Sequence, residues 1–139
     1  RPEQIGAQPG AAPQHLPELG FRAHHLEENQ VHDLGHVDAK RVRDYLHIKT
    51  EDIASITGRS DRSIRQDPDA SSLQPALQKV VYIISGLKQL AGGDDRSVRL
   101  WLKASHPALQ GDSPIHLLRG GEIDIVKKLV DHMLSGAPA

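Results

Sequence analysis

The amino-acid sequence predicts an all-α fold with a single hydrophobic core. The chain has 139 residues, enough to bury about two-thirds of the surface of the unfolded chain in one domain. Its composition is 37% hydrophobic but only 3% aromatic, so the core must be built from Leu, Ile, Val and Ala. Apolar residues recur at helical spacing and no segment alternates as a strand would. We therefore expect a helix-turn-helix-like N-terminal half, a long central helix and a helical C-terminal domain.

Residues 1–37 are expected to form a flexible arm. The first 20 residues contain four prolines and three glycines, which deny the backbone the donors and dihedral angles of a regular element. Residues 21–37 are loosely compatible with a short helix that ends at Gly35. The arm also carries five of the nine histidines. His32 and His36 lie four residues apart, as on one helix face, with His25 further back, but we interpret these side chains as solvated and predict no metal site.

Residues 38–72 predict three short helices joined by tight turns, which is the pattern of a helix-turn-helix. Asp38 is expected to cap the first helix, whose Val42, Tyr45 and Leu46 share one face. Thr50 is expected to cap the second helix, and Gly58 to end it.

The third of these helices is the candidate DNA-binding element. Ser60 or Asp61 caps it, Ile64 is its buried residue, and it must end before Pro68. Residues 40–66 hold seven basic and four acidic residues and so have a positive net charge, whereas residues 1–39 and 67–139 do not. The outward-facing residues suited to bases or phosphates are Ser60, Arg62, Ser63, Arg65 and Gln66. The alternative is a small packing unit whose arginines are simply solvated.

Residues 73–139 predict a long central helix followed by three more helices. An apolar stripe runs from Leu73 to Leu90 and is followed by a glycine pair. Asp94 or Asp95 begins the next helix, in which Val98, Trp101 and Leu102 form a face. The following helix is capped by Ser113, has Pro114 at its first position, and ends at the glycine pair Gly120-Gly121. The last helix is apolar on more than one face and reaches Gly136, which suggests an exposed surface for a partner.

Composition excludes several kinds of function. The chain has no cysteine, which rules out disulfides, thiolate catalysis and zinc fingers and fits a cytoplasmic protein. Its formal net charge is −1, and no 18-residue apolar run is present to span a membrane. The sequence has no G-x-S-x-G turn around a nucleophilic serine. It has no phosphate-binding loop either, because the glycine pairs follow helices rather than strands. We therefore predict a binding protein with no catalytic residues, cofactor or metal.

The run from Asp94 to Gly136 carries a recognisable order of motifs. A helix with Trp101-Leu102 comes first, then a loop with His106-Pro107-Ala108-Leu109. The run Ser113-Pro114-Ile115-His116-Leu117-Leu118-Arg119-Gly120-Gly121-Glu122 and an amphipathic closing helix follow. This order resembles the toxin-binding domain of the Xre/MbcA/ParS antitoxins. Residues 38–91 resemble the Xre-like helix-turn-helix half of the same family more weakly.

The resemblance implies an antitoxin of a bacterial type II toxin-antitoxin system. Such a protein neutralises a RES-domain toxin that consumes NAD by occluding its active site, and represses its own operon through the helix-turn-helix. The resemblance also implies a homodimer or a larger hetero-oligomer with the toxin. Pro114, Leu117 and Leu118 then shape the turn and core. The implied toxin-binding residues are Arg119, Gly120, Gly121, Glu122, Ile125, Leu129, His132 and Met133.

Two features depart from the family pattern, and two other functions remain open. Relatives often place a bulky apolar residue after the glycine of the closing helix, whereas Ala137-Pro138-Ala139 follows Gly136 here, and residues 1–37 have no counterpart. The first alternative is a free-standing dimeric helix-turn-helix transcriptional regulator whose C-terminal helices dimerise without a toxin. The second is a structural adaptor whose acidic arm recruits a basic partner.

Overall fold

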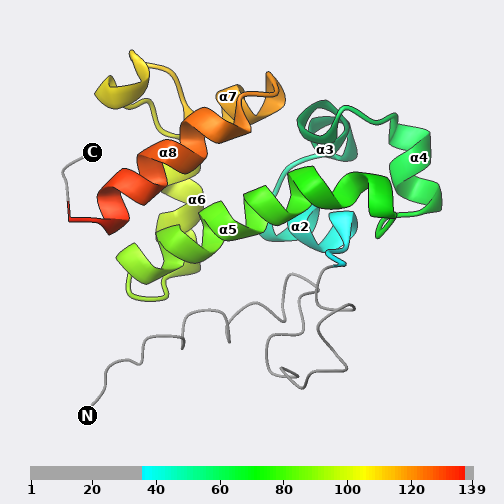
Figure 1. Cartoon of the computed structure of the whole chain (residues 1–139), viewed down its shortest axis with the longest axis horizontal. Coiled ribbons are helices and arrows are strands. Elements are labelled where there is room, and N and C mark those ends of the chain that lie inside the picture. Colours follow the sequence, from blue (N-terminus) through cyan, green and yellow to red (C-terminus); the bar gives the residue numbers. More distant parts are fainter. Residues whose placement is uncertain (1–35, 137–139) are drawn as a thin grey trace, which may run out of the picture.

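The computed structural model describes residues 36–136, and this part of the chain is helical without any strand, which confirms the all-α prediction (Figure 1). The arm up to residue 35, including the expected helix in it and His25 and His32, lies outside the described residues. The α-helices are α2 (Ala39–Leu46), α3 (Thr50–Thr57), α4 (Asp61–Gln66), α5 (Gln74–Leu90), α6 (Asp95–Lys103), α7 (Pro114–Arg119) and α8 (Ile123–Leu134). Two 3₁₀ turns, η5 (Ser71–Leu73) and η6 (Pro107–Leu109), complete the order.

Local capping places the ends of most of these helices where the sequence predicts them. The side chain of Asp38 accepts the backbone N–H of Lys40 at 2.7 Å and so caps α2. At the end of α3, Gly58 adopts the left-handed conformation with φ of 73°. The expected cap at Thr50 is wrong. The N-cap of α3 is Lys49, whose N–H donates to Asp52 Oδ2 at 3.0 Å, so the helix starts one residue earlier and the hydroxyl of the buried Thr50 accepts from Arg43.

A buried amide fixes the point where the chain enters the helical body. The N–H of Val37 donates to Gln74 Oε1 at 2.6 Å, and Gln74 Nε2 donates back to the carbonyl of Val37 at 3.1 Å. The N–H of Ala39 donates to the carbonyl of Pro68 at 2.8 Å. Gln74 is only 7% exposed, and its hydrogen bonds compensate for the burial of its amide. This pairing holds the start of α2 beside the start of α5.

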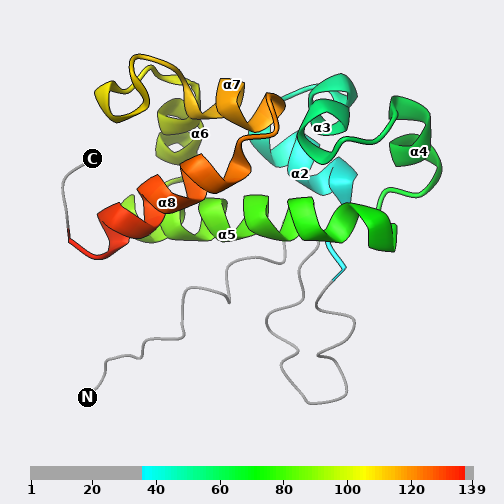
Figure 2. The same ribbon diagram turned by 45° about the horizontal axis from the view of Figure 1, so that its top comes forward.

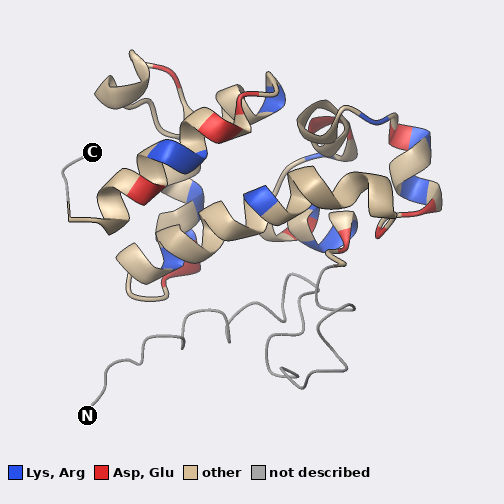
Figure 3. Ribbon diagram, viewed as in Figure 1, with Lys and Arg blue, Asp and Glu red and all other residues tan. Residues whose placement is uncertain are grey.

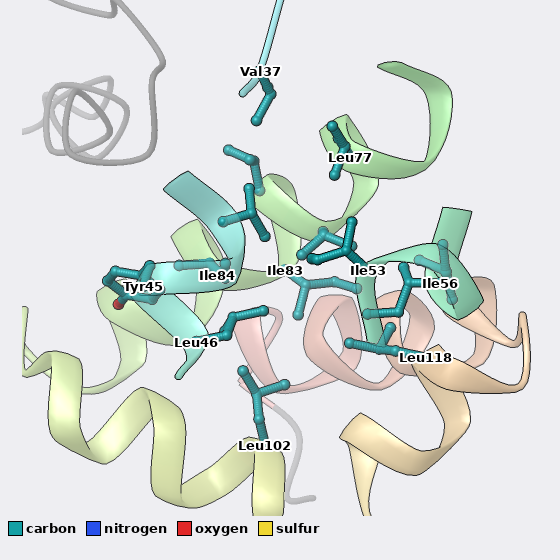
Figure 4. Close-up of a cluster of buried hydrophobic side chains, with 14 of the residues drawn as sticks. Val37, Tyr45, Leu46, Ile53, Ile56, Leu77, Ile83, Ile84, Leu102 and Leu118 are labelled. Atoms are coloured by element: carbon teal, nitrogen blue, oxygen red, sulfur yellow. The ribbon is translucent and has the colours of Figure 1, made fainter. Parts of the chain in front are cut away.

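One hydrophobic core joins the two halves of the chain, as the length predicts (Figure 4). Helix α5 lies at its centre, and its Leu77, Ile83 and Ile84 are fully buried. The other helices add buried residues along one side of α5 (Figure 2), namely Val42 from α2, Ile53 from α3, Leu102 from α6, Leu118 from α7 and Val126 from α8. Removing the larger of these side chains from water contributes about 1.5–3 kcal/mol each. Helices α2 to α4 and the C-terminal helices therefore pack as one body.

Helix α8 lies along α5 in the same direction, and the two helices touch at a glycine (Figures 1 and 2). Lys79 of α5 pairs with Asp124 near the start of α8, and further along α5 Gly86 faces the later residues Val130 and Leu134. A Cβ atom built on Gly86 would lie 2.7 Å from Val130 Cγ1 and 3.0 Å from Leu134 Cδ1. Gly86 is buried, and it permits a close approach that a larger residue would block.

A polar cluster connects α2, α5 and α6 at the edge of the core. Tyr45 donates its hydroxyl hydrogen to Asp95 Oδ1 at 2.6 Å, and Lys88 Nζ lies 3.2 Å from the same oxygen. Arg99 donates from Nε to the backbone carbonyl of Tyr45 at 2.5 Å and places its guanidinium 5.0 Å from the centre of the Tyr45 ring. Desolvation raises the pKa of the Asp95 carboxyl, but the hydrogen bonds from Tyr45 and Lys88 outweigh it and hold this pKa below its ordinary value.

We expect Gly86→Ala to lower the free energy of unfolding. Overpacking against Val130 costs about 1–3 kcal/mol, more than the roughly 1 kcal/mol gained in helix propensity. In Gly86→Ala/Val130→Ala the new methyl group fills the space that Val130 vacates, so the double variant should be more stable than the sum of the single effects. Urea unfolding of the four proteins measures this, with Gly120→Ala as a control because its Cβ would meet nothing closer than 3.6 Å. Additive effects would show that the contact is not tight.

We expect Asp95→Asn to reduce the acid dependence of stability. The lowered pKa means that ionised Asp95 stabilises the fold above its unfolded value of about 3.9, and that this stabilisation is lost as the pH falls through the folded pKa. The variant should therefore be less stable than the wild type at pH 7 and should differ less from it at pH 2. Thermal unfolding across this range is the measurement. Asp69→Asn, which removes an exposed carboxylate, is the control for the change of net charge.

Candidate functional site

The turn between α7 and α8 is built by a cap at one end and two glycines at the other. Ser113 Oγ accepts the N–H of His116 at 3.3 Å, and Pro114 occupies the first turn of α7, as predicted. Leu118 is fully buried and anchors the helix to the core. Gly121 follows with φ of 80°, a conformation that side chains other than glycine rarely adopt. The predicted residues Arg119, Gly120, Gly121 and Glu122 are consequently all exposed on this turn.

Arg119 connects this turn to α3. Its Nε lies 3.0 Å from Asp52 Oδ1 on α3, with the two side chains 41% and 20% exposed. Because Leu118 beside it is fixed in the core, the backbone of Arg119 is held while its side chain reaches across the surface. The sequence places Arg119 in the candidate surface, but nothing in the sequence indicates Asp52 as its partner.

The outer face of α8 continues the same surface. Val126 and Val130 are fully buried against the core, so the opposite side of the helix faces away from it. Ile125 is 46% exposed on that side, and Lys128 and His132 beside it are exposed. Two of the predicted residues lie deeper. Leu129 is only 9% exposed, and Met133 is half-buried and packs against the core.

The remaining edge of α8 is occupied by polar contacts to α5. Asp131 accepts a hydrogen bond from the hydroxyl of Tyr82 and pairs with Lys127 Nζ at 3.2 Å. Lys127 Nζ also lies 4.6 Å from the centre of the Tyr82 ring. The hydrogen bond with Asp131 raises the pKa of Tyr82 and lowers that of Asp131. These internal contacts distinguish this edge from the side that carries Ile125.

The predicted DNA-binding residues are all exposed on or beside α4. Ile64 is 1% exposed and holds the helix to the core, and Arg62, Ser63, Arg65 and Gln66 are exposed. The ribbon of α4 carries both basic and acidic positions (Figure 3). Ser60 caps the helix by accepting the N–H of Ser63 at 3.1 Å, and the two hydroxyls are hydrogen-bonded at 3.0 Å. Arg65 lies 4.0 Å from Asp61.

Sequence reasoning missed one further exposed cation near this helix. Arg59 follows the left-handed Gly58 in the turn between α3 and α4, beside the start of α4. Its position directly after the helix-ending Gly58 is the sequence signal that could have identified Arg59 as an exposed residue of this surface. It adds a positive charge at the N-terminal end of the candidate helix.

Two other kinds of site find no support within residues 36–136. No group of three or more metal-ligating side chains occurs there, and the exposed His36 instead contacts the carbonyl of Asp69 through Nδ1 at 3.1 Å. In the same part of the chain no helix has the length and apolar character needed to cross a membrane.

Comparison with known proteins connects the C-terminal surface to a family. Residues 87–136 match the family described as the antitoxin Xre/MbcA/ParS C-terminal toxin-binding domain. Neither the curated proteins nor the solved structures gave a match. The matched segment runs from the last turn of α5 through α8 and includes both the exposed glycine turn and the outer face of α8. This match supports an antitoxin role with a toxin as partner. Residues 87–136 are therefore similar to the toxin-binding domains of the Xre/MbcA/ParS antitoxins.

Proposed function

We propose that this chain is the antitoxin of a type II system in the cytoplasm and neutralises a RES-domain toxin that consumes NAD. The observation that carries the proposal is that the family match over residues 87–136 coincides with an exposed face on α8 and on the turn before it. Inhibition would be steric. The antitoxin covers the opening of the toxin's active site and needs no chemistry of its own.

The composition of this surface suits a protein partner. Ile125 offers an exposed apolar side chain, and Arg119, Glu122 and Lys128 supply a charged rim around it. Gly120 and Gly121 carry no side chains, so the backbone of a partner can approach the turn closely. A stable interface needs about 800 Å² from each partner, so the neighbours of the turn and of the outer face of α8 must also take part in it.

Co-expression with the product of an adjacent RES-domain gene tests the proposal. We expect the two proteins to elute together in size exclusion, and NAD consumption by the toxin to stop when this chain is present. A toxin that elutes alone and consumes NAD at an unchanged rate would refute it. The same elution profile gives the stoichiometry, which we propose to be a hetero-oligomer containing two or more copies of this chain.

We expect Ile125→Asp to weaken toxin binding tenfold or more, because a charge replaces an exposed apolar contact at the centre of the surface. Circular dichroism should show an unchanged fold, since this side chain is 46% exposed. Leu129→Asp should instead lower the melting temperature, because its side chain is buried. Leu90→Asp is the matched control, as Leu90 is 47% exposed on α5. Equal toxin affinity for Ile125→Asp and wild type would place the interface elsewhere.

We further propose that α4 binds operator DNA and that the protein thereby represses its own operon. The burial of Ile64 supports this proposal, because it directs Arg62, Arg65 and Gln66 away from the core. Arginine pairs with guanine or phosphate, and glutamine pairs with adenine. A free-standing dimeric regulator would use the same helix but would associate through the C-terminal helices. That alternative predicts a stable homodimer with no co-purifying toxin.

We expect Arg62→Ala/Arg65→Ala to weaken operator binding at least tenfold and to reduce its salt dependence, because two cationic contacts are removed. Affinity for the toxin should not change, since α4 lies outside the matched domain. Gel-shift titrations at several salt concentrations measure the affinity for the operator and its salt dependence. Arg96→Ala/Lys103→Ala, which removes two exposed cations from α6, controls for net charge. Unchanged operator affinity in the α4 variant would exclude α4 as the recognition helix.

A further inference from the structure

We propose that Asp52, in the helix-turn-helix half, is a positioning residue for toxin recognition. It holds the guanidinium of Arg119 so that the unused N–H groups of that side chain meet a carboxylate on the toxin. This inference rests on the proposed function, since it needs a toxin that binds the turn between α7 and α8. It adds a residue outside the family-matched segment to the toxin-binding surface.

Asp52 is itself held in place by its helix. Its Oδ2 accepts the backbone N–H of Lys49 at 3.0 Å at the start of α3, while Oδ1 lies 3.0 Å from Arg119 Nε. The carboxylate is therefore fixed at both oxygens, and its side chain is only 20% exposed. A fixed acceptor restricts the rotamers of the longer arginine side chain that pairs with it.

Arg119 retains most of its donors. A guanidinium carries five N–H groups, and its contact with Asp52 is an ion pair on the Nε side. Within residues 36–136 the Nη atoms of Arg119 make no hydrogen bond or ion pair, and the side chain is 41% exposed. The two Nη atoms form an edge that matches the two oxygens of a carboxylate.

The surroundings of Arg119 leave that edge accessible. The next two residues, Gly120 and Gly121, have no side chains to cover it, and Leu118 keeps the backbone fixed in the core. A partner carboxylate thus meets an arginine whose orientation is already set. Binding then costs less side-chain entropy than it would with a freely rotating arginine, and the affinity is higher for that reason.

A double-mutant cycle in the full-length chain tests the inference, with affinity measured by calorimetry against the toxin that co-purifies with the wild type. Asp52→Asn keeps an oxygen for the Lys49 N–H but removes the charge that orients Arg119. We expect it to weaken toxin binding about two- to fivefold, the range of exposed ion pairs. Arg119→Gln should weaken binding more, and Asp52→Asn should have no further effect in the Arg119→Gln background. Glu51→Gln removes a neighbouring charge from the same turn of α3 and should leave the affinity unchanged.

NMR relaxation of Arg119 Nε in the free protein gives a readout that does not need the toxin. We expect the order parameter of this group to be lower in Asp52→Asn than in the wild type, because the ion pair that restricts the side chain is lost. An unchanged order parameter, unchanged or tighter toxin binding by Asp52→Asn, or additive losses in the double variant would each overturn the inference. Failure of the wild type to bind any toxin would instead refute the proposed function, and this inference with it.

Discussion

The contact between α5 and α8 at Gly86 determines how the rest of the molecule is arranged. A Cβ atom on Gly86 would collide with Val130, so the missing side chain is what lets α8 lie directly along the central helix. That contact buries Val126 and Val130 completely and leaves Ile125 on the opposite side of α8. The surface proposed to bind the toxin is therefore the reverse face of a packing contact inside the domain.

Polar contacts then join the family-matched helices to α2 and α3. Tyr45 at the end of α2 donates its hydroxyl hydrogen to Asp95 of α6, and its carbonyl accepts from Arg99 of the same helix. Arg119 of α7 pairs with Asp52 of α3. These contacts extend from the matched segment to helices outside it, and none of them involves α4. Ile64 is the buried residue of α4, and this helix packs beside α3. Because the helices share one core, the packing of the whole fold sets the position of α4 relative to the outer face of α8.

Local signals in the sequence were sufficient for the helix order and for most helix ends. Caps and glycines act on their own neighbours, and periodicity correctly identified Ile64 as buried and Arg62 as outward-facing. The start of α3 was missed by one residue because Asp52 forms the reciprocal hydrogen bond at Lys49. Contacts between distant segments could not be predicted. The fit of Gly86 against α8 and the pairing of Asp52 with Arg119 depend on how helices pack, which periodicity does not describe.

Hydrogen-deuterium exchange of the full chain with and without its toxin locates the toxin-binding surface. We expect slower amide exchange on complex formation in the turn at residues 119–122 and along α8, with α4 unchanged. Those amides belong to the exposed turn and to the helix that carries Ile125, whereas α4 projects from another part of the surface. Slower exchange confined to α4, or no change along α8, would contradict the assignment of this face as the toxin-binding surface.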